Sequence, residues 1–329
     1  MAIVDSVVQF EGESKGFFIK PIIEEPTLTS LGWEFIYGQT DMWLYFNSTL
    51  GKITREKTAC GSTDSTDGID VTRKQIQYVE LEAYKTQCYK TFDNTILAMA
   101  RKTGINKADL INGTGDIQKL LLQVVEEAVM RDFLRIALLA NTALASADYN
   151  MIDGWYVKVN ADPDTVDSGV TVNATTLNTT NFVATMTSIY TARSRRAKQT
   201  PNSEMAWYVT RNVYDAWQSF LLSNQATDTS LTRFINGEVP ASLFGIEMIV
   251  LDIVDEFLEA DFTTSGVTDQ PYRIVLAKKD QTKVAIDSPS AGKELEIWYD
   301  NNTELNKYRA KYNLDIQIGY GEYFTTAGF

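Results

Sequence analysis

Apolar and polar side chains alternate without interruption from Lys307 to Tyr320. One face carries the apolar residues Tyr308, Ala310, Tyr312, Leu314, Ile316, Ile318 and Tyr320. The opposite face carries the polar residues Lys307, Arg309, Lys311, Asn313, Asp315 and Gln317. A period of two predicts a β-strand with one buried face. At a rise near 3.3 Å per residue the strand would be roughly 45 Å long, which exceeds what compact domains usually need. The pattern indicates an elongated subunit.

A partner for this strand is expected just upstream. The segment Glu294 to Tyr299 reads Glu-Leu-Glu-Ile-Trp-Tyr, and the polar run Asp-Asn-Asn-Thr separates it from the long strand. Polar runs of this kind favour a turn. We therefore expect two long antiparallel strands joined through residues 300–303.

One face of the segment from Ile117 to Ala140 is apolar at helical spacing. Its apolar members are Ile117, Leu120, Leu121, Val124, Val125, Ala128, Val129, Phe133, Ile136, Ala137 and Ala140, and the wetter side carries Lys119, Glu126, Glu127, Arg131, Asp132 and Arg135. Thr114 or Asp116 can cap this helix. At 1.5 Å per residue it would extend about 36 Å, similar to the long strand. A helix lying along long strands predicts an elongated α+β layer.

The region before the helix carries two different patterns. Residues 1–47 combine Pro21 and Pro26 with an aromatic run that has no clear helical period, which predicts an extended arm docked on another surface. The aromatic residues are Trp33, Phe35, Tyr37, Trp43, Tyr45 and Phe46. In residues 48–92 a polar tip at 60–68 lies between ordered flanks, and Val79, Leu81 and Ala83 alternate with polar neighbours. This predicts a protruding β-hairpin, with an ordinary surface loop as the alternative.

The chain changes character after a polar, loop-like run at residues 160–180. Short helical faces then alternate with short strands, which predicts a separate α/β domain. The helical faces are Phe182, Met186, Ile189 and Tyr190, and Val213, Trp217, Phe220 and Leu221; the strands are 206–209, 246–251 after Gly245, and 272–277. Thr210 is expected to cap the second helix.

Composition narrows the possible chemistry. The 329 residues contain no histidine, so the usual proton-transfer residue and the commonest metal ligand are both absent. Cys60 and Cys88 have neither metal-ligand spacing nor a disulfide pattern, which predicts free thiols in a reducing compartment. No stretch resembles a membrane span or a signal peptide, so no membrane association is expected. A formal net charge of -13 opposes nonspecific binding to nucleic acid. If the protein functions near DNA, it would enclose the DNA without binding it tightly.

Clusters of acidic residues offer two candidate sites. Asp162, Asp164 and Asp167 suggest calcium, but Val166 stands at a ligand position, so a solvated acidic loop is favoured. A carboxylate pair of a glycosidase could come from the set Asp252, Asp255, Glu256 and Glu259. Acid pairs are abundant in a chain with 43 acidic residues, and the expectation is no cofactor, no metal and no catalytic residue.

A basic cluster stands out against this acidic background. It contains Arg193, Arg195, Arg196 and Lys198, at the end of an expected helix. Either the helix dipole explains these charges, or they contact an acidic neighbouring subunit. Both readings are open.

The order of these parts resembles the major capsid protein of tailed bacteriophages, with its Hong Kong 97-type fold. The most telling stretches are Asp116 to Met130, Tyr208 to Trp217 and Val239 to Val250. The resemblance implies an α+β subunit with a spine helix, long antiparallel strands, an axial α/β domain, an extended N-terminal arm and a β-hairpin E-loop. The implied parts are an arm at 1–47, a hairpin at 48–92, a peripheral domain with the spine helix at 93–158, an axial domain at 159–280, and a return to the peripheral domain at 281–329.

The function implied by the resemblance is assembly. Many copies would form hexamers and pentamers of an icosahedral head around double-stranded DNA, in the virion, after assembly in the host cytoplasm. The chain starts almost at its arm, so a scaffolding segment would be either a separate protein or missing from this sequence. Portal and decoration proteins would be further partners. Subunit contacts are expected at Lys52, Lys57, Asp64, Asp67, Arg193, Arg195 and Arg196.

Subunit crosslinking would add chemistry to this function, and two other functions are alternatives to it. Some relatives crosslink subunits through a lysine, and Lys52, Lys57 and Lys74 lie in the hairpin region, but no crosslinking motif surrounds them. An encapsulin-type nanocompartment shell would share the fold and differ in its cargo. A carboxylate-dependent soluble hydrolase would be compact and would form small oligomers at most.

Overall fold

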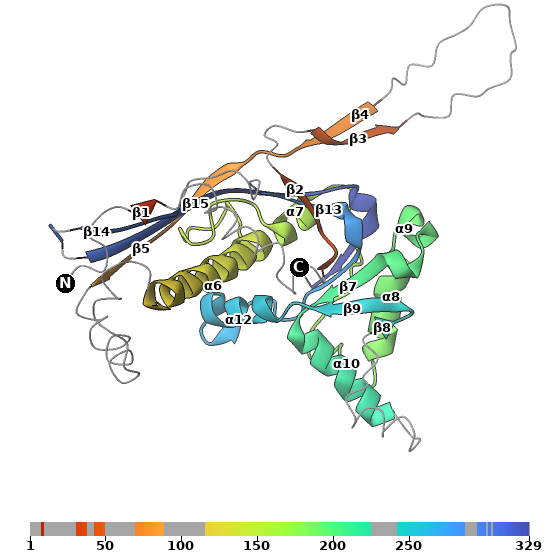
Figure 1. The fold of residues 1–329 in the computed structure, drawn as a ribbon. Coiled ribbons are helices and arrows are strands. Elements are labelled where there is room, and N and C mark those ends of the chain that lie inside the picture. Colours follow the sequence, from red (N-terminus) through yellow and green to blue (C-terminus); the bar gives the residue numbers. More distant parts are fainter. Residues whose placement is uncertain are drawn as a thin grey trace, which may run out of the picture.

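The molecule consists of two sheets with helices between and beside them, and a ribbon that extends away from the body (Figure 1). The computed structural model describes residues 8–9, 31–37, 43–49, 70–88, 116–224, 242–286, 295–300, 302–303 and 305–328. One sheet forms a long layer with helix α6 beneath it, and the second sheet lies at one end of that layer (Figure 1). The α+β prediction is confirmed.

The long sheet is organised around β15 (Leu305–Ile318), a strand of 14 residues. Its antiparallel neighbours are β5 (Val79–Cys88), β14 (Leu295–Asp300) and β13 (Thr282–Ile286). Two short segments complete the sheet: β1 (Val8–Gln9) pairs with β14, and β2 (Glu34–Tyr37) runs parallel to β13. The predicted long strand and its upstream mate are both confirmed, with β15 displaced by two residues toward the N-terminus from the predicted 307–320.

Burial along β15 follows the predicted alternation, with one correction. The buried apolar side chains are Ala310, Tyr312, Leu314, Ile316 and Ile318. Asp315, assigned to the wet face, is only 5 % exposed. Its carboxylate accepts a hydrogen bond of 2.8 Å from the backbone N–H of Gln77, in the connection between β4 and β5. The expected solvent face is therefore covered at this end of the strand.

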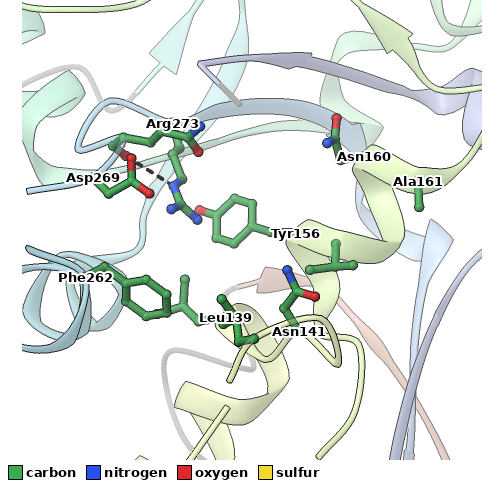
Figure 2. Close-up of a pocket in the computed structure, with 11 residues that line it drawn as sticks. Leu139, Asn141, Tyr156, Asn160, Ala161, Phe262, Asp269 and Arg273 are labelled. Carbon is green, nitrogen blue, oxygen red and sulfur yellow. Dashed lines mark hydrogen bonds between the residues drawn. The ribbon is translucent and has the colours of Figure 1, made fainter. Parts of the chain in front are cut away.

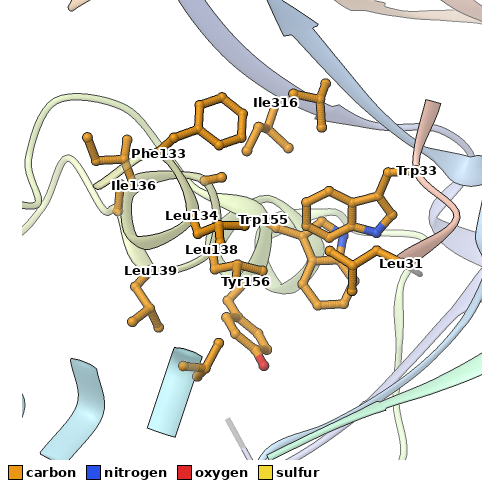
Figure 3. Close-up of a cluster of buried hydrophobic side chains, with 14 of the residues drawn as sticks. Leu31, Trp33, Phe133, Leu134, Ile136, Leu138, Leu139, Trp155, Tyr156 and Ile316 are labelled. Carbon is orange, nitrogen blue, oxygen red and sulfur yellow. The ribbon is translucent and has the colours of Figure 1, made fainter. Parts of the chain in front are cut away.

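Helices α6 (Asp116–Leu139) and α7 (Trp155–Ala161) pack beneath the long sheet. Figure 3 shows the core that these helices share with the sheet. Phe133 and Leu134 of α6 meet Ile316 of β15 in this core. Trp155 of α7 is fully buried, and its indole N–H donates a 2.9 Å hydrogen bond to Thr282 Oγ1. The spine helix is thus confirmed, although Ala128, assigned to its apolar stripe, is exposed.

The second sheet has helices on both faces. Its strands in spatial order are β6 (Val166–Asp167), β16 (Phe324–Ala327), β12 (Ile274–Lys278), β7 (Met205–Val209), β9 (Ile246–Val250) and β8 (Ser242–Leu243). Its neighbouring helices are α8 (Phe182–Ala192), α9 (Arg195–Gln199), α10 (Arg211–Asn224) and α12 (Asp252–Asp261). The predicted strands 206–209, 246–251 and 272–277 are thus found as β7, β9 and β12.

Strand β7 shows how the second sheet joins the two cores of the subunit. Met205, Trp207 and Val209 enter a core formed with α8 and α10, whereas Ala206 and Tyr208 enter the core shared with α6, α7 and the long sheet. Side chains alternate across a strand, so a strand between two cores is buried on both faces. All five residues of β7 are buried accordingly.

Short helical turns and two tight hairpins complete the fold. The 3-10 turns are η1 (Asn202–Glu204), η2 (Lys279–Gln281) and η3 (Gly321–Tyr323), and a small hairpin follows α12 as β10 (Thr263–Thr264) and β11 (Val267–Thr268). The β8–β9 hairpin turns through Phe244 and Gly245, with φ of 56° and 72°. A two-residue hairpin loop with both φ values positive matches a type I′ turn, which explains the glycine before β9.

The C-terminal end departs from the expected return to the long strands. After β15 the chain crosses through η3 to β16, which pairs with β12 and β6 of the second sheet. The five ranges proposed for the parts of the chain stay predictions, but 281–329 contributes strands to both sheets.

Candidate assembly surfaces

A two-stranded ribbon projects from the body of the subunit (Figure 1). It consists of β3 (Trp43–Thr49) and β4 (Asp70–Gln75), which pair antiparallel with a register irregularity near Trp43. Within the described residues these strands pair only with each other. A lone two-stranded ribbon is marginally stable in water, so this element is suited to lie on another surface.

The position of the ribbon bears on two sequence-based expectations. Its first strand begins at Trp43, inside the range assigned to the arm. The alternating residues Val79, Leu81 and Ala83 lie in β5 and pair with β15, outside the hairpin. Alternation showed that a strand exists there but did not identify its partner, because register and pairing are set by tertiary packing.

The root of the ribbon is fixed to the body by polar contacts. The ammonium group of Lys74, in β4, pairs with the carboxylate of Asp162 at the C-terminal end of α7. The same group donates a 2.5 Å hydrogen bond to the carbonyl of Gly319, just after β15. The side-chain amide of Gln317 donates to the backbone carbonyl of Gln75 at 3.0 Å. The last residues of β4 are therefore tied both to α7 and to the end of β15.

Packing and a buried acid reinforce this root. Ile76, immediately after β4, is fully buried. Asp315 accepts hydrogen bonds from Gln77 N–H and from Ile316 N–H, each at 2.8 Å. Burial raises the pKa of Asp315, and these backbone hydrogen bonds act in the opposite direction. The ribbon is thus anchored at its base, while its paired strands project outward.

The contacts of Lys74 and Asp162 also bear on the crosslinking and calcium sites considered from the sequence. Lys74, considered as a crosslinking residue, is engaged within its own subunit. Asp162 closes a turn by accepting from Asp164 N–H at 3.0 Å, whereas Asp167 accepts from Gly169 N–H at 2.9 Å. The described residues hold no cluster of three or more metal-ligating side chains. The calcium candidate is therefore not assembled by the fold.

The basic cluster separates into groups with different surroundings. Arg193 caps the end of α8 and is buried; its Nε donates to the Tyr190 carbonyl at 2.8 Å, and its guanidinium carbon lies 3.6 Å from the Tyr190 ring centre. This is the contact expected of a cation at a helix C-terminus. Arg195 and Lys198, on α9, are exposed. Arg193 is therefore buried in the subunit, whereas Arg195 and Lys198 can meet a neighbour.

Arg196 joins α9 to the C-terminal segment. Its guanidinium group lies 3.3 Å from the carboxylate of Glu322, and 4.4 Å from the centre of the Tyr320 ring. Ser194 caps α9 by accepting from Ala197 N–H at 3.0 Å, and its hydroxyl donates to the Glu322 carbonyl at 2.6 Å. Arg196 thus has an intramolecular role, on a side chain that is still partly exposed.

The acidic residues of α12 do not form a free carboxylate pair. Asp255 is buried and accepts a 2.6 Å hydrogen bond from Arg211 N–H, the first residue of α10. Glu256 pairs with Arg131 of α6, and Asp252 lies 3.6 Å from Arg211. Burial raises the pKa of Asp255 to about 6. These acids join helices, and the hydrolase alternative has no pair of free carboxylates among them.

Thr210 was expected to cap α10, but its side chain makes other contacts. The hydroxyl of Thr210 donates to the carbonyl of Pro271 at 2.9 Å and accepts from Arg273 N–H at 3.1 Å. Asp255, distant in sequence, takes the capping role, since a carboxylate is favoured at a helix N-terminus. No local sequence signal could have identified that residue.

Residues 31–37, within the range assigned to the arm, dock on their own subunit. The carbonyl of Leu31 accepts a hydrogen bond from the hydroxyl of Tyr208, and both residues are buried. Trp33 packs against Trp155 with ring centres 5.4 Å apart. Trp33 therefore belongs to the subunit core and Phe35 packs against it, whereas Tyr37 is exposed.

Several predicted contact residues lie outside the described residues. They are Lys52, Lys57, Asp64 and Asp67, together with the polar tip at 60–68. Among the described segments, no helix is long and apolar enough to cross a membrane.

Comparison with known proteins identifies the fold. No family model matches the sequence, and no curated protein matches it. A chain from the capsid of Myoviridae phage XM1 superposes with a TM-score of 0.57 at 12% identity, over 92% of this chain and 90% of that one. A chain of the satellite phage P4 procapsid gives 0.54 at 10% identity, over 94% and 97%. A Mycobacterium phage Ogopogo chain gives 0.54 at 11%, over 98% and 94%. The chain has the fold of tailed-phage major capsid proteins.

Proposed function

We propose that this chain, with its Hong Kong 97-type fold, is a major capsid protein that assembles into the hexamers and pentamers of an icosahedral phage head. The head would enclose double-stranded DNA without sequence-specific contacts. The role is structural and requires no catalytic residue, cofactor or metal ion. The protein would reside in the virion capsid after assembly in the host cytoplasm, with separate scaffolding, portal and decoration proteins as partners.

The β3–β4 ribbon is the observation that carries this proposal. Its base is held by Lys74 and by the buried residue Ile76, while the paired strands extend beyond the body (Figure 1). A ribbon that leaves its own core needs another surface to cover it. A second copy supplies that surface in a closed assembly of identical subunits.

The charge of the chain constrains how copies meet. A formal net charge of -13 makes unspecific association of copies unfavourable. Exposed cations at a contact reduce this repulsion, and Arg195 and Lys198 are exposed on α9. Arg195 therefore fits the proposed contact set better than Arg193, which is buried, or Arg196, which already pairs with Glu322.

Sedimentation velocity on protein expressed with and without the other head genes tests this function. We expect rings or shells far heavier than the 36.9 kDa chain. Nuclease-resistant DNA inside particles made in infected cells separates a phage head from an encapsulin-type compartment. A single species at the monomer mass, across concentration and salt and with scaffolding protein present, would contradict the proposal.

A further inference from the structure

A cavity of about 350 Å³ lies where α7 and the ends of α6 and α12 meet the loop before β12 (Figure 2). Apolar side chains form part of its wall, notably Leu139 and Phe262. Polar groups line the remainder, including Asn141, Asn160, Arg273 and the carboxylate of Asp269. A concave site with apolar walls and a few convergent polar groups is the usual form of a ligand pocket.

Arg273 provides the charge in this cavity. Its side chain is 9 % exposed, and Figure 2 shows the guanidinium group directed toward Tyr156 inside the cavity. Its Nε donates to the carbonyl of Gln270 at 3.2 Å, and its guanidinium carbon lies 5.2 Å from the Tyr156 ring centre. The exposed carboxylate of Asp269 lines the same cavity and acts on this guanidinium electrostatically, but the described residues form no ion pair with Arg273.

A buried cation without a counter-ion is costly, because desolvation is not offset by an ion pair. Asp269 and Asp255 are acids that act on Arg273 electrostatically without forming an ion pair with it. Asp255 is already committed to Arg211 N–H. An arginine stays protonated despite such burial, so the cavity holds a buried positive charge that no ion pair within the described residues neutralises.

The backbone beside Arg273 is held in an unusual conformation. Gln270 has φ of 43°, in the left-handed region that side chains other than glycine rarely adopt. Its carbonyl holds Arg273 Nε, while the Thr210 hydroxyl fixes both Pro271 and the Arg273 N–H. Backbone strain of this kind concentrates at ligand sites, where it positions a functional group.

We propose that this cavity binds a carboxylate group, which pairs with the guanidinium of Arg273. The planar fork of arginine matches a carboxylate, and the apolar wall formed by Leu139 and Phe262 suits the short carbon chain that carries it. Two sources supply this chemistry: an acidic side chain of a second copy, or a small free carboxylate. The chain has 43 acidic residues against 30 basic ones, so a second copy offers many such groups.

Three substitutions at two positions isolate the charge of the site. Asn160 lines the cavity from α7 and is exposed, so a change there spares the core. Asn160→Asp adds a negative charge at the rim, while Asn160→Gln is a neutral control of similar chemistry. Arg273→Lys keeps the positive charge and removes the planar fork.

The first arm of the test uses the unassembled subunit. Sodium acetate and sodium succinate are titrated while the Nε–Hε NMR signal of Arg273 is followed, with sodium chloride at equal ionic strength as the control. A free carboxylate ligand gives a saturable shift that chloride does not give. We expect Asn160→Asp to weaken carboxylate binding about tenfold through like-charge repulsion. Asn160→Gln should leave the affinity unchanged. Arg273→Lys lacks the Nε–Hε signal and so confirms its assignment.

The second arm concerns a neighbouring copy and rests on the proposed assembly. If the carboxylate belongs to a second copy, the free subunit shows no saturable shift, and Asn160→Asp raises the concentration needed for assembly about tenfold while Asn160→Gln does not. The proposal is overturned if no carboxylate titrates specifically and Asn160→Asp behaves as Asn160→Gln, or if wild type neither binds nor assembles. Failure of wild type to assemble would reject the proposed function alone when the first arm is positive.

Discussion

The ammonium group of Lys74 pairs with the carboxylate of Asp162, and so joins the projecting ribbon to the end of α7. Asp162 is nearly buried, whereas Lys74 keeps partial contact with solvent. Pairing of a buried carboxylate across two elements far apart in sequence fixes the direction in which the ribbon leaves the body. The ribbon's orientation is therefore a property of the folded subunit.

Replacement of Lys74 by methionine should loosen the ribbon at its root. Loss of the pair leaves the Asp162 carboxylate poorly compensated, at a cost of roughly 1–3 kcal/mol. Hydrogen exchange should become faster in β4 while α6 keeps its protection. Lys85→Met, at an exposed position of β5, is the matched control. Equal protection of β4 in both variants would show that the pair does not hold the ribbon.

Leu314→Ala tests the core under the long strand. Leu314 is fully buried, and removal of its side chain should lower the free energy of unfolding by about 2–5 kcal/mol. Its partner in the β15–β5 ladder, Val79, is 37 % exposed, so Val79→Ala should cost about 0.5 kcal/mol or less. Chemical denaturation of the two variants gives the comparison. Similar losses of stability in the two variants would show that the buried face of β15 is assigned incorrectly.

Asp315→Ala should be destabilising, although its position in the alternation suggested a tolerant site. The substitution leaves the Gln77 N–H without its acceptor and is expected to cost about 1–3 kcal/mol. Lys311→Ala, on the same face, breaks only a surface pair with Glu80 and should change stability by about 0.5 kcal/mol. Thermal unfolding distinguishes the two. If the Asp315→Ala protein were as stable as wild type, this carboxylate would not stabilise the root of the ribbon.

The pH dependence of stability should carry the signature of Asp255. Burial raises its pKa from 3.8 to about 6, so the folded state binds this proton more tightly than the unfolded state. The resulting stabilisation is complete below pH 3.8 and is lost as the pH rises through about 6. Asp255→Asn keeps the acceptor for Arg211 N–H without the titration.

Denaturant unfolding of wild type and Asp255→Asn between pH 4 and pH 7 measures this effect. Wild type should gain up to roughly 3 kcal/mol relative to the variant on acidification, as a difference of about two pKa units implies. Parallel curves for the two proteins would show that Asp255 titrates normally in the fold.

Regular periodicity made the long elements predictable from sequence. The alternation through Tyr312, Leu314 and Ile316 and the helical stripe with Phe133 each depend on one buried face, and both elements are found where expected. Periodicity reports which side of an element is apolar. It carries no information on what covers the other side, so the burial of Asp315 was not predicted.

Contacts between distant segments explain the other differences. Asp255 caps α10, and Lys74 reaches Asp162, through pairings of residues that no local pattern links. Strand β5 shows a clean alternation, yet its partner β15 lies near the other end of the chain. Each of these contacts depends on the packing of the whole subunit, which also forms the cavity around Arg273.

Cryo-electron microscopy of the purified assembly tests the central claim most directly. The account predicts closed icosahedral particles in which the β3–β4 ribbon of each subunit lies on a neighbouring copy. A reconstruction in which the ribbon contacts only its own subunit, or a preparation that contains only monomers when scaffolding protein is present, would contradict it.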